Sequence, residues 1–267
     1  MPSTAETFQV SLEMAEAYES RFVPALFGEW AGRLVEAAGV APGQRVLDVA
    51  CGTGAVARAA AERTGETGAT VGLDLNEAMI AVARRVRPDL EWRQGDAAAL
   101  PFPDASFDAV LCQAALMFFP DVEQAMQEMA RVVRPEGTVG VQVWDRAEDQ
   151  PSYGPLIDVV GRHAGPEAIN LVNTYFVRGD LAELTALFGN AGLEVTSTRT
   201  ETTTMRYASV DEAVAIEVQS TPLGERLTDG VLRRILEDAG EVLRPFLNAE
   251  GELLMPIGGH LILARRG

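Results

Sequence analysis

Strand-like and helix-like segments alternate along the middle of the chain, and this alternation constrains the fold more than any other feature. Segments with helical periodicity separate short runs that are apolar almost throughout. Strands that are apolar on both faces are typical of a parallel sheet covered by helices on both sides. The pattern therefore predicts an α/β fold with a Rossmann-like, mostly parallel sheet. The predicted strands are 45–50, 70–75, 90–96, 107–116 and 138–144.

Several residues mark where the helices between these strands begin and end. Gly65 closes the helix after the first strand, since glycine commonly follows a helix C-terminus. Asn76 is a favourable N-cap for the next helix. Asp121 with Gln124 resembles a capping box for the third, and a turn at 135–137 is expected before the fifth strand. The second helix carries these apolar positions on one face: Met79, Val82, Ala83 and Val86.

The chain on either side of this core is predicted to be mainly helical. Residues 8–38 are expected to form one or two helices, with Pro24 marking a break between them. Past Asp145 the connections are longer than a sheet needs, and such segments usually carry function. We interpret them as a helical cap. The elements predicted there are helices 151–175 and 181–191, an edge strand 193–207, a helical region 209–247 divided at Pro222 and Gly224, and a last strand 260–266.

The formal net charge of −17 bears on the partners of the protein. A surface this acidic repels phosphate backbones and anionic lipids, so neither nucleic acid nor a membrane is expected as a partner. The longest apolar run, 109–120, is too short to span a bilayer. The first ten residues have neither the basic stretch nor the apolar core of a secretory signal, so we expect a cytoplasmic location.

All 22 basic residues are arginine, and the lack of lysine removes two enzyme classes. A Walker-type P-loop needs a lysine, and so does the Schiff base of a pyridoxal-phosphate enzyme. The two cysteines, Cys51 and Cys112, stand outside any CxxC or Cys/His cluster. We therefore expect no metal site.

The first strand ends in a glycine-rich run from Asp48 to Gly54. Ligands of open α/β sheets bind beyond the carboxyl ends of the strands, and glycines there let backbone N–H groups approach a ligand. Because Gly52 to Ala57 also matches G-x-G-x-x-A, a nicotinamide or flavin cofactor is an alternative. Asp74 ends the second strand, 20 residues after Gly54. A carboxylate at this place accepts the ribose hydroxyls of an adenosine-containing cofactor.

The third and fourth strands also end in residues suited to a cofactor. Gly95, Asp96 and Ala97 end the third, where a carboxylate can accept from an adenine amino group and a backbone N–H can donate to the ring. Gln113 ends the fourth strand, and it faces the point where the reactive end of the cofactor is expected.

These motifs together resemble those of class I S-adenosylmethionine-dependent methyltransferases. The matching stretches are VLDVACGTG, GLDLNEAMI, GDAAALPFPDASFDAVLCQ and RVVRPEGTVGV, in the family's order over Val46 to Val141. They are especially similar to those of the ubiquinone/menaquinone-biosynthesis enzymes and their small-molecule relatives. LPFPDASFD is more specific than any glycine pattern, and nicotinamide enzymes do not share the set. The resemblance implies S-adenosylmethionine as the cofactor and a seven-stranded sheet whose last strand is antiparallel.

The resemblance also implies roles for the matched positions. The family often has glycine where Ala50 stands, so an intact site presupposes that Ala50 does not need a positive φ. The methionine end of the cofactor is assigned to Asp48, Ala50, Cys51 and Gly52, and to the backbone of Gln113. The ribose is assigned to Asp74, the adenine to Gly95, Asp96 and Ala97, and the apolar contacts of the adenosine to Leu75 and Met79. Tyr18 is assigned to a helix that closes over the cofactor.

These assignments lead to a prediction of one methyltransferase domain over 1–267. It comprises an N-terminal helical lid (1–40), a cofactor-binding core (41–145) and the remaining strands with helical cap insertions (146–267). The expected partner is a small-molecule methyl acceptor, with the protein a monomer or a homodimer.

The predicted activity is methyl transfer to that acceptor by in-line displacement. A sulfonium is already an excellent leaving group, so positioning and electrostatics should dominate. His163 is the candidate general base, because an imidazole titrates near neutral pH. The candidates for lining the acceptor pocket are aromatic or sulfur-containing: Phe22, Met117, Phe118, Trp144 and Tyr175.

Two other functions remain open on the sequence alone. An NAD(P)-dependent oxidoreductase could use the same glycine-rich turn and Asp74, although no Tyr/Lys or His/Asp hydride-transfer constellation is recognisable. A non-catalytic S-adenosylmethionine-binding protein would explain why no base motif is evident.

Overall fold

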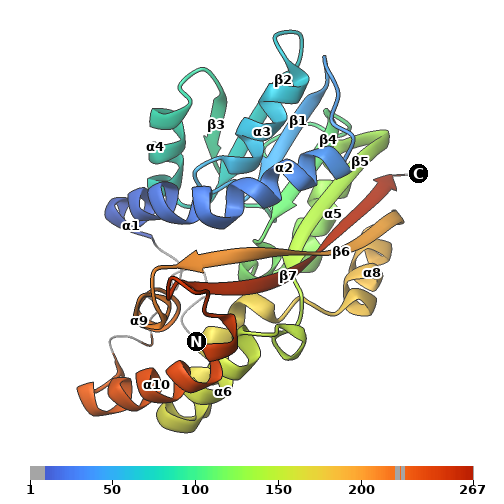
Figure 1. Cartoon of the computed structure of the whole chain (residues 1–267). Helices are drawn as coiled ribbons and strands as arrows, with labels where there is room; N and C mark the ends of the chain where they lie inside the picture. The colour runs from blue at the N-terminus through green and yellow to red at the C-terminus, as the bar shows by residue number, and fades with distance from the viewer. Residues whose placement is uncertain (1–9, 220–222, 224–225, 267) are drawn as a thin grey trace. The chain divides into compact units, whose positions relative to one another are not determined.

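The structure, a computed structural model, describes residues 10–219, 223 and 226–266. Within these residues seven strands form one sheet in the order β3-β2-β1-β4-β5-β7-β6 (Figure 1). The predicted Rossmann-like, mostly parallel α/β fold is confirmed. The strands are β1 (Arg45–Val49), β2 (Ala69–Asp74), β3 (Glu91–Gln94), β4 (Phe107–Gln113), β5 (Val133–Trp144), β6 (Leu193–Tyr207) and β7 (Leu253–Arg266).

The strand order creates the place where a ligand can bind. β1 pairs in parallel with β2 on one side and with β4 on the other, and β3 and β5 extend the two sides, also in parallel. The chain therefore builds outward in two directions from β1. At such a switch point the connections after β1 and β4 diverge, which leaves a crevice at the carboxyl ends of the strands.

Helices connect the parallel strands as expected. They are α3 (Ala55–Thr64), α4 (Glu77–Val86) and α5 (Val122–Val132), with a short η3 (Leu116–Phe118) after β4. Gly65 is the C-cap of α3 with φ of 63°, and the side chains of Asn76 and Asp121 cap α4 and α5. The apolar face predicted for α4 is partly wrong, because Ile80 is buried with Val82 and Ala83 whereas Val86 is 39% exposed.

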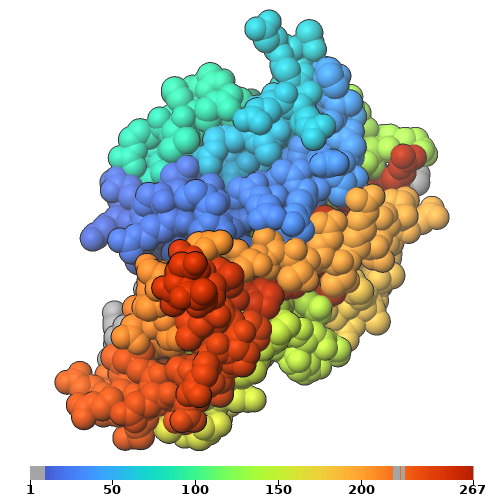
Figure 2. All heavy atoms as spheres, viewed as in Figure 1, coloured from blue at the N-terminus to red at the C-terminus, as the bar shows by residue number. Residues whose placement is uncertain are grey.

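The N-terminal helices form one continuous rod, which is seen in blue in Figure 1. The rod comprises α1 (Leu12–Ala17), η2 (Tyr18–Phe27) and α2 (Gly28–Ala37). The predicted break at Pro24 is wrong: Pro24 lies inside η2, which is a π-helix. A π-helix pairs each N–H with the carbonyl five residues earlier, so a proline that lacks an N–H can be accommodated by this local change of pairing. The N-terminal end of the rod contacts α4, and Figure 2 shows it beside that helix.

The turn predicted at 135–137 does not interrupt the fifth strand. β5 begins at Val133, and Glu136 within it has φ of 62°. The register with β4 shifts between Phe107 and Ala109. Phe107 pairs with Val133 and Ala109 with Thr138, so β5 has three more residues than β4 between these pairs, which makes the irregularity a large β-bulge. Its sequence resembles that of a turn, because glycine and a left-handed residue occur in both.

The remaining helices follow the predictions at 151–175, 181–191 and 209–247. Pro222 and Gly224, the predicted divisions of the last helical region, lie outside the described residues. The helices are η4 (Ala147–Asp149), α6 (Tyr153–Ala164), α7 (Pro166–Asn173), η5 (Thr174–Phe176), α8 (Leu181–Asn190), α9 (Val210–Val214), η6 (Ala215–Gln219), α10 (Asp229–Val242) and η8 (Arg244–Phe246).

No helix in the described ranges is long and apolar enough to cross a membrane.

The chain separates into two compact units. The first comprises Met1–Val143, Leu181–Arg199 and His260–Gly267, and holds β1 to β4 with the N-terminal rod. The second comprises Trp144–Asp180 and Thr200–Gly259, and holds α6, α7, α9 and α10. The predicted cap insertions fall mostly in this second unit, and their role as a cap stays a prediction.

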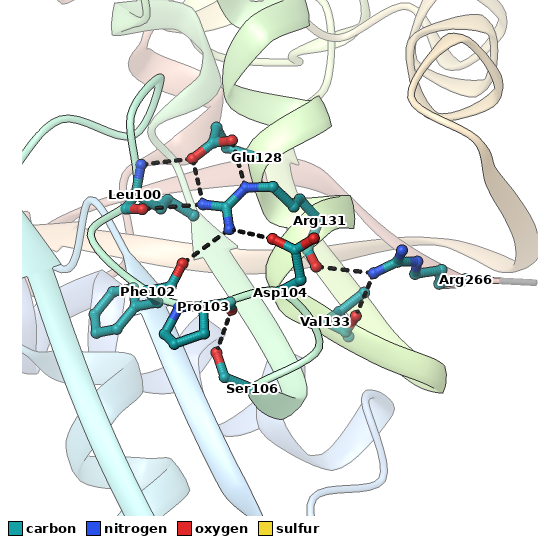
Figure 3. A network of polar contacts seen from close by, with 9 residues as sticks. All are labelled: Leu100, Phe102, Pro103, Asp104, Ser106, Glu128, Arg131, Val133 and Arg266. Atoms are coloured by element: carbon teal, nitrogen blue, oxygen red, sulfur yellow. Dashed lines mark hydrogen bonds and ion pairs between the residues drawn. The ribbon is translucent and has the colours of Figure 1, made fainter.

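One arginine organises the loop between β3 and β4 (Figure 3). Arg131, on α5, donates to the carbonyl oxygens of Leu100 at 3.0 Å and Phe102 at 2.8 Å, and to the carboxylates of Asp104 and Glu128. Glu128 in turn accepts from the backbone N–H of Leu100 at 2.7 Å. The loop is the LPFPDASFD motif, so this motif is held by the helix that precedes β5.

Candidate functional site

The glycine-rich turn after β1 depends on backbone conformations that favour glycine. Gly52 has φ of 54° and Gly54 has φ of 91°. A Cβ on Gly54 would lie 2.2 Å from Cη2 of Trp92, so no other residue fits at this position. Gly54 is also the N-cap of α3 and supplies no capping side chain. Another residue must therefore satisfy the first N–H groups of that helix.

Asp48 supplies that cap. Its Oδ2 accepts from the backbone N–H of Ala57 at 2.8 Å, in the first turn of α3. The carboxyl is 1% exposed, and its Oδ1 is buried with no hydrogen-bond partner among the described residues. Burial raises the pKa of Asp48 to about 8, with the N–H of Ala57 opposing this shift and the charge of Asp74 adding to it. One oxygen of the predicted methionine-binding carboxyl is thus left for a ligand.

Asp74 braces the same turn from the end of β2. Its Oδ2 accepts from the N–H of Gly52 and its Oδ1 from the N–H of Asn76, both at 2.8 Å. Burial raises the pKa of Asp74 above its ordinary value, and these two N–H groups oppose the shift. A carboxylate oxygen has a second lone pair, so accepting from ribose hydroxyls remains compatible with both bonds. The ribose role of Asp74 stays a prediction.

A backbone hydrogen bond joins the end of β3 to the end of β2. Gly95 donates its N–H to the carbonyl of Asp74 at 3.0 Å, and a Cβ on Gly95 would approach Leu73 to 2.9 Å. Asp96 is exposed, with Oδ1 accepting from the N–H of Ala98 at 2.8 Å, and Ala97 is 8% exposed. Asp96 therefore has an oxygen and an exposed position available for the predicted adenine contact.

Two apolar residues that follow Asp74 are the ones predicted to contact the adenosine. Leu75 is 47% exposed although it is a leucine, and Met79 is half-buried on α4. Cys51 is buried beneath the turn and donates its N–H to the carbonyl of Leu73 at 2.9 Å. Burial raises the pKa of the Cys51 thiol, so Cys51 is not a thiolate at neutral pH.

The N-terminal rod is tied to the glycine-rich turn, which sequence reasoning had expected only for Tyr18. A Cβ on Gly52 would lie 3.7 Å from Cε1 of Tyr18, so the tyrosine ring covers the turn. Glu19 accepts from Oγ1 of Thr53 at 2.5 Å and from Arg58 at 3.0 Å. Arg58 also donates to the carbonyl of Thr53 at 2.7 Å. Glu19 and Arg58 are 39 positions apart, so no local pattern could have paired them.

Tyr18 lies in an acidic environment. Burial raises the pKa of its phenol above the ordinary value, and the nearby carboxylates of Asp74, Asp48 and Glu19 raise it further. Tyr18 therefore stays protonated at neutral pH and can donate a hydrogen bond.

Ala50 adopts the conformation that the sequence analysis presupposed it would avoid. Its φ is 55°, in the left-handed region, so the expectation that alanine avoids a positive φ here is wrong. Ala114, which follows β4, has φ of 48°. Both residues leave the carboxyl ends of neighbouring strands, where backbone strain is often concentrated at functional sites.

Replacing Ala50 with glycine should stabilise the protein. A left-handed alanine costs about 1 kcal/mol relative to glycine, so we expect Ala50→Gly to raise the free energy of unfolding by about that amount in urea titrations. Ala59→Gly, in the interior of α3, is the control and should lower it by about 1 kcal/mol. A loss of stability in Ala50→Gly would show that the Cβ of Ala50 makes packing contacts that outweigh the strain.

A side-chain hydrogen bond holds Gln113 in position, in addition to its place in β4. Nε2 donates to the carbonyl of Phe27 at 2.9 Å, which links the end of β4 to the N-terminal rod. Ala114 donates its N–H to the carbonyl of Gln142 at 2.8 Å. The backbone contact of Gln113 with the methionine portion stays a prediction.

The predicted acceptor-lining residues fall in different units. Phe22, Met117 and Phe118 belong to the first unit and are half-buried, with the ring of Phe22 stacked 6.2 Å from that of Tyr18. Trp144 and Tyr175 belong to the second unit, where Trp144 is 3% exposed and Tyr175 is 39% exposed. Whether these five residues line one pocket stays a prediction.

His163 lies on α6 in the second unit, paired with a carboxylate. Its Nε2 is 2.8 Å from Oδ2 of Asp238 on α10, which also accepts from Arg162 at 2.7 Å. These contacts lower the pKa of Asp238, with the hydrogen bond from His163 as the largest cause. Such a pair connects α6 to α10 and engages Nε2 of His163.

A second polar cluster of this unit was missed by sequence reasoning. Tyr207 donates its hydroxyl to Glu217, and the hydroxyls of Tyr153 and Tyr207 are 3.3 Å apart. Burial raises the pKa of Glu217 above its ordinary value, while the two tyrosines oppose the shift. The three residues come from α6, β6 and η6, so only the tertiary structure brings them together.

The site can be tested for its fit to S-adenosylmethionine. Asp48 offers a buried unpaired oxygen beside a turn that only glycine can form, Asp74 lies across from it, and exposed Leu75 offers an apolar surface. A cofactor with a cationic amino-acid end, a ribose and an adenine needs an anionic group, a hydroxyl acceptor and an apolar face, respectively. The residues present therefore fit this cofactor.

Comparison with known proteins agrees with this fit. Residues 47–141 match the family model described as a methyltransferase domain. The chain is 36% identical over 182 residues to the ubiquinone/menaquinone biosynthesis C-methyltransferase UbiE of Cupriavidus necator. This match covers 62% of this chain and 73% of that protein. It is 40% identical over 127 residues to a demethylmenaquinone methyltransferase of Renibacterium salmoninarum, covering 48% of this chain and 51% of the relative.

The chain thus spans about half the length of several curated relatives that it matches. Among solved structures, the YcgJ protein of Bacillus subtilis has a TM-score of 0.62 with this chain at 24% identity, covering 88% of this chain and 97% of the other. Similarity at this identity shows the fold. The Cupriavidus relative, matched over nearly three quarters of its length, shows the family. The chain belongs to the class I S-adenosylmethionine-dependent methyltransferases of the ubiquinone/menaquinone-biosynthesis type.

Proposed function

We propose that the protein transfers the methyl group of S-adenosylmethionine to a small-molecule acceptor by in-line displacement. One observation carries the proposal. At the carboxyl end of β1, the carboxyl of Asp48 keeps one oxygen unpaired while Asp74 and Gly54 hold the adjacent turn in the conformation that admits a ligand. Relatives named for quinone substrates support a quinone in its reduced form, which is an aromatic hydroxyl compound, as the first acceptor to examine.

The residues of the chain have positioning roles in this reaction. When bound, S-adenosylmethionine supplies a methyl group on a sulfonium, which is a good leaving group. Asp74 would hold the ribose, and Leu75 with Met79 would contact the adenosine. Tyr18, over Gly52, would exclude water from the turn and donate its phenolic hydrogen there. Holding the acceptor in line with the bond that breaks contributes most of the rate in a reaction of this kind.

Calorimetric titration of the purified protein tests the proposal. S-adenosylmethionine and S-adenosylhomocysteine are expected to bind at micromolar concentration, whereas NAD and NADP are expected to show no heat of binding. Methyl transfer is then measured with a panel of aromatic hydroxyl compounds. Binding of a nicotinamide cofactor in place of the first two would contradict the proposal. Cofactor binding with no transfer to any acceptor would instead favour the non-catalytic binding protein.

The raised pKa of Asp48 predicts how cofactor binding depends on pH. A carboxyl with a pKa of about 8 is mostly protonated at pH 7, and a cationic ligand favours the ionised form. Binding should therefore release a proton, and the affinity for S-adenosylhomocysteine should rise by up to about tenfold per pH unit between pH 6 and 8. Calorimetry in buffers of different ionisation enthalpy counts this proton. Asp48→Asn should abolish the release, and release that persists in this variant would assign it to another group.

The raised pKa of Asp48 also predicts how the free energy of unfolding depends on pH. Between about pH 4 and pH 8 the folded protein keeps a proton on Asp48 that the unfolded chain has lost, so the contribution of Asp48 to stability falls as pH rises through this window. Above about pH 8 both states are ionised and the contribution stays constant. The stability of Asp48→Asn relative to the parent should accordingly increase from pH 5 to pH 8, as measured by urea unfolding.

His163 remains our candidate for the general base. As a base, it would be needed only if the acceptor loses a proton, and we expect His163→Ala to lower kcat at saturating acceptor about 100-fold. Arg162→Ala is the matched control, because it removes the other partner of Asp238. Unchanged kcat in His163→Ala would leave the pairing of α6 with α10 as the role of this histidine.

A further inference from the structure

The ends of three adjacent strands place two glutamines beside the glycine-rich turn. Asp48 pairs with Leu111, Leu111 pairs with Gly140, and Gln113 pairs with Gln142. Ala50 follows directly after β1, so it stands near the level of Gln113 on β4. We call Ala50, Gln113 and Gln142 the row, in which only the two glutamines belong to paired strands. With strands about 4.8 Å apart, Gln142 lies about 10 Å from Ala50.

Both glutamine side chains lie on the face of the sheet that the N-terminal rod covers. Nε2 of Gln113 reaches the carbonyl of Phe27 on the rod. A Cβ on Gly140 would lie 3.3 Å from Leu34 of α2, and side chains two residues apart on a strand share a face. Gln142 therefore faces α2 as well. Asp48 is on this face too, because it caps α3, which contacts α2.

The amide of Gln142 is buried and unpaired. Gln142 is 0% exposed, and neither its Oε1 nor its Nε2 has a hydrogen-bond partner among the described residues. Oε1 of Gln113 is also buried and unpaired. Buried polar groups are nearly always hydrogen-bonded, so a cluster of such atoms from neighbouring strands calls for a specific explanation. A polar ligand group that enters beside the row, displacing the side chains that bury these atoms, would satisfy them.

The unpaired atoms indicate what kind of group this is. Gln142 offers two N–H donors and one acceptor oxygen, and Gln113 offers a second acceptor oxygen. An ammonium group would leave the donors unsatisfied, and a carboxylate would face two carbonyl oxygens with the carboxyl of Asp48 on the same face. A neutral hydroxyl accepts from the N–H donors of Gln142 and donates to one of the two amide oxygens, so it satisfies both kinds of group. We propose that Gln113 and Gln142 bind a neutral hydroxyl group of the methyl acceptor.

This inference rests on the proposed function, because the row identifies the acceptor only if the cofactor's methionine end lies at Ala50 and Gly52. A reacting atom must approach the methyl carbon to about 3 to 3.5 Å. The positions beside Ala50 are the glycine-rich turn on one side and Gln113 with Gln142 on the other. Gln142 is two strands from the turn, which suits a group of the acceptor better than one of the cofactor.

The first experiment compares two buried glutamines by thermal unfolding. Gln142→Met keeps the shape of the side chain and removes the unpaired atoms, so its Tm is expected to equal or exceed that of the parent. Gln150→Met is the matched control. Gln150 is 2% exposed and fully engaged, since it donates to Gly258 and Asp145 and accepts from the N–H of Gly258. Its replacement should lower Tm by at least about 4 °C.

The second experiment measures two ligands by calorimetry. S-adenosylhomocysteine should bind Gln142→Met within about threefold of the parent affinity. 1-Naphthol, added to the complex with S-adenosylhomocysteine, should bind the parent and bind Gln142→Met at least about tenfold more weakly. Naphthalene, which lacks the hydroxyl, should bind the two proteins equally. Gln113→Met should weaken 1-naphthol binding in the same direction.

The outcomes separate the two proposals. If S-adenosylhomocysteine does not bind the parent, the proposed function fails. If it binds and 1-naphthol does not, or if 1-naphthol binds both proteins equally, the hydroxyl-binding role is overturned and the function stands. A fall in Tm of Gln142→Met like that of Gln150→Met would assign the amide to the fold, and a tenfold loss of S-adenosylhomocysteine affinity would assign it to the cofactor. Each of these also overturns the inference.

Discussion

Asp74→Asn is expected to weaken the binding of S-adenosylhomocysteine at least about 100-fold. Two charge-assisted hydrogen bonds to ribose hydroxyls would be weakened, each contributing about 1.5 to 3 kcal/mol. The backbone contributes to the same loss. Asp74 accepts from Gly52 and Asn76 on separate oxygens, so an amide must turn its NH₂ group toward one of these N–H donors. The glycine-rich turn would lose part of its support together with the ribose contact.

The measurement is calorimetric titration of the parent and the variant with S-adenosylhomocysteine. Asp89→Asn is the control, because Asp89 is an exposed carboxylate paired with Arg87 and it should bind as the parent does. An affinity of Asp74→Asn within threefold of the parent would remove Asp74 from the cofactor site. Titration with NAD in parallel distinguishes this loss from a change of cofactor class.

Arg131→Met is expected to lower the free energy of unfolding by about 3 kcal/mol. The guanidinium of Arg131 joins α5 to the loop between β3 and β4, with bonds to the carbonyls of Leu100 and Phe102 and to two carboxylates (Figure 3). Hydrogen bonds that involve a charged group contribute about 1.5 to 3 kcal/mol each, and partial exposure of Arg131 reduces the sum. Urea unfolding of the two proteins measures the difference.

The difference in the free energy of unfolding between the parent and Arg131→Met should become smaller at acidic pH. The hydrogen bond from Arg131 lowers the pKa of Glu128, so the folded protein holds this carboxylate ionised at pH values where the unfolded chain is protonated. The resulting stability is present above the ordinary pKa of glutamate and is lost as pH falls below it. Arg134→Met, which breaks an exposed pair with Asp108, is the control and should cost less than about 1 kcal/mol. Equal losses in the two variants would show that the loop is not held by Arg131.

Most of the sheet could be predicted because its signals are local. Period and apolar content identified β1 to β4, and the caps at Asn76 and Asp121 were correct because capping depends on residues three positions apart. The errors at Pro24 and at 135–137 have one cause. A proline or a glycine-rich triplet is compatible with a break or with an irregularity inside an element, and only the neighbouring elements select between them.

Some residues of the candidate site could also be found from local signals, whereas others could not. Asp48, Gly52 and Asp74 could be found because they lie at or just past the ends of strands, and in a parallel sheet all such ends lie at one edge. Glu19, Arg58 and Gln142 carried no motif. Their partners come from distant segments, and a glutamine in a strand looks the same in sequence whether its amide is satisfied or not.

The sequence by itself determined the fold class, the strand ends and the family motifs, because these depend on periodicity, spacing and residue type within short windows. The tertiary structure decided which groups meet: Arg131 with the LPFPDASFD loop, and Glu19 with Thr53 and Arg58. It placed Gln113 and Gln142 at paired positions of neighbouring strands. It also decided that Ala50 takes a left-handed conformation. Pairings between distant segments follow from packing the whole chain, since burial and the need to satisfy buried polar groups act on all elements at once.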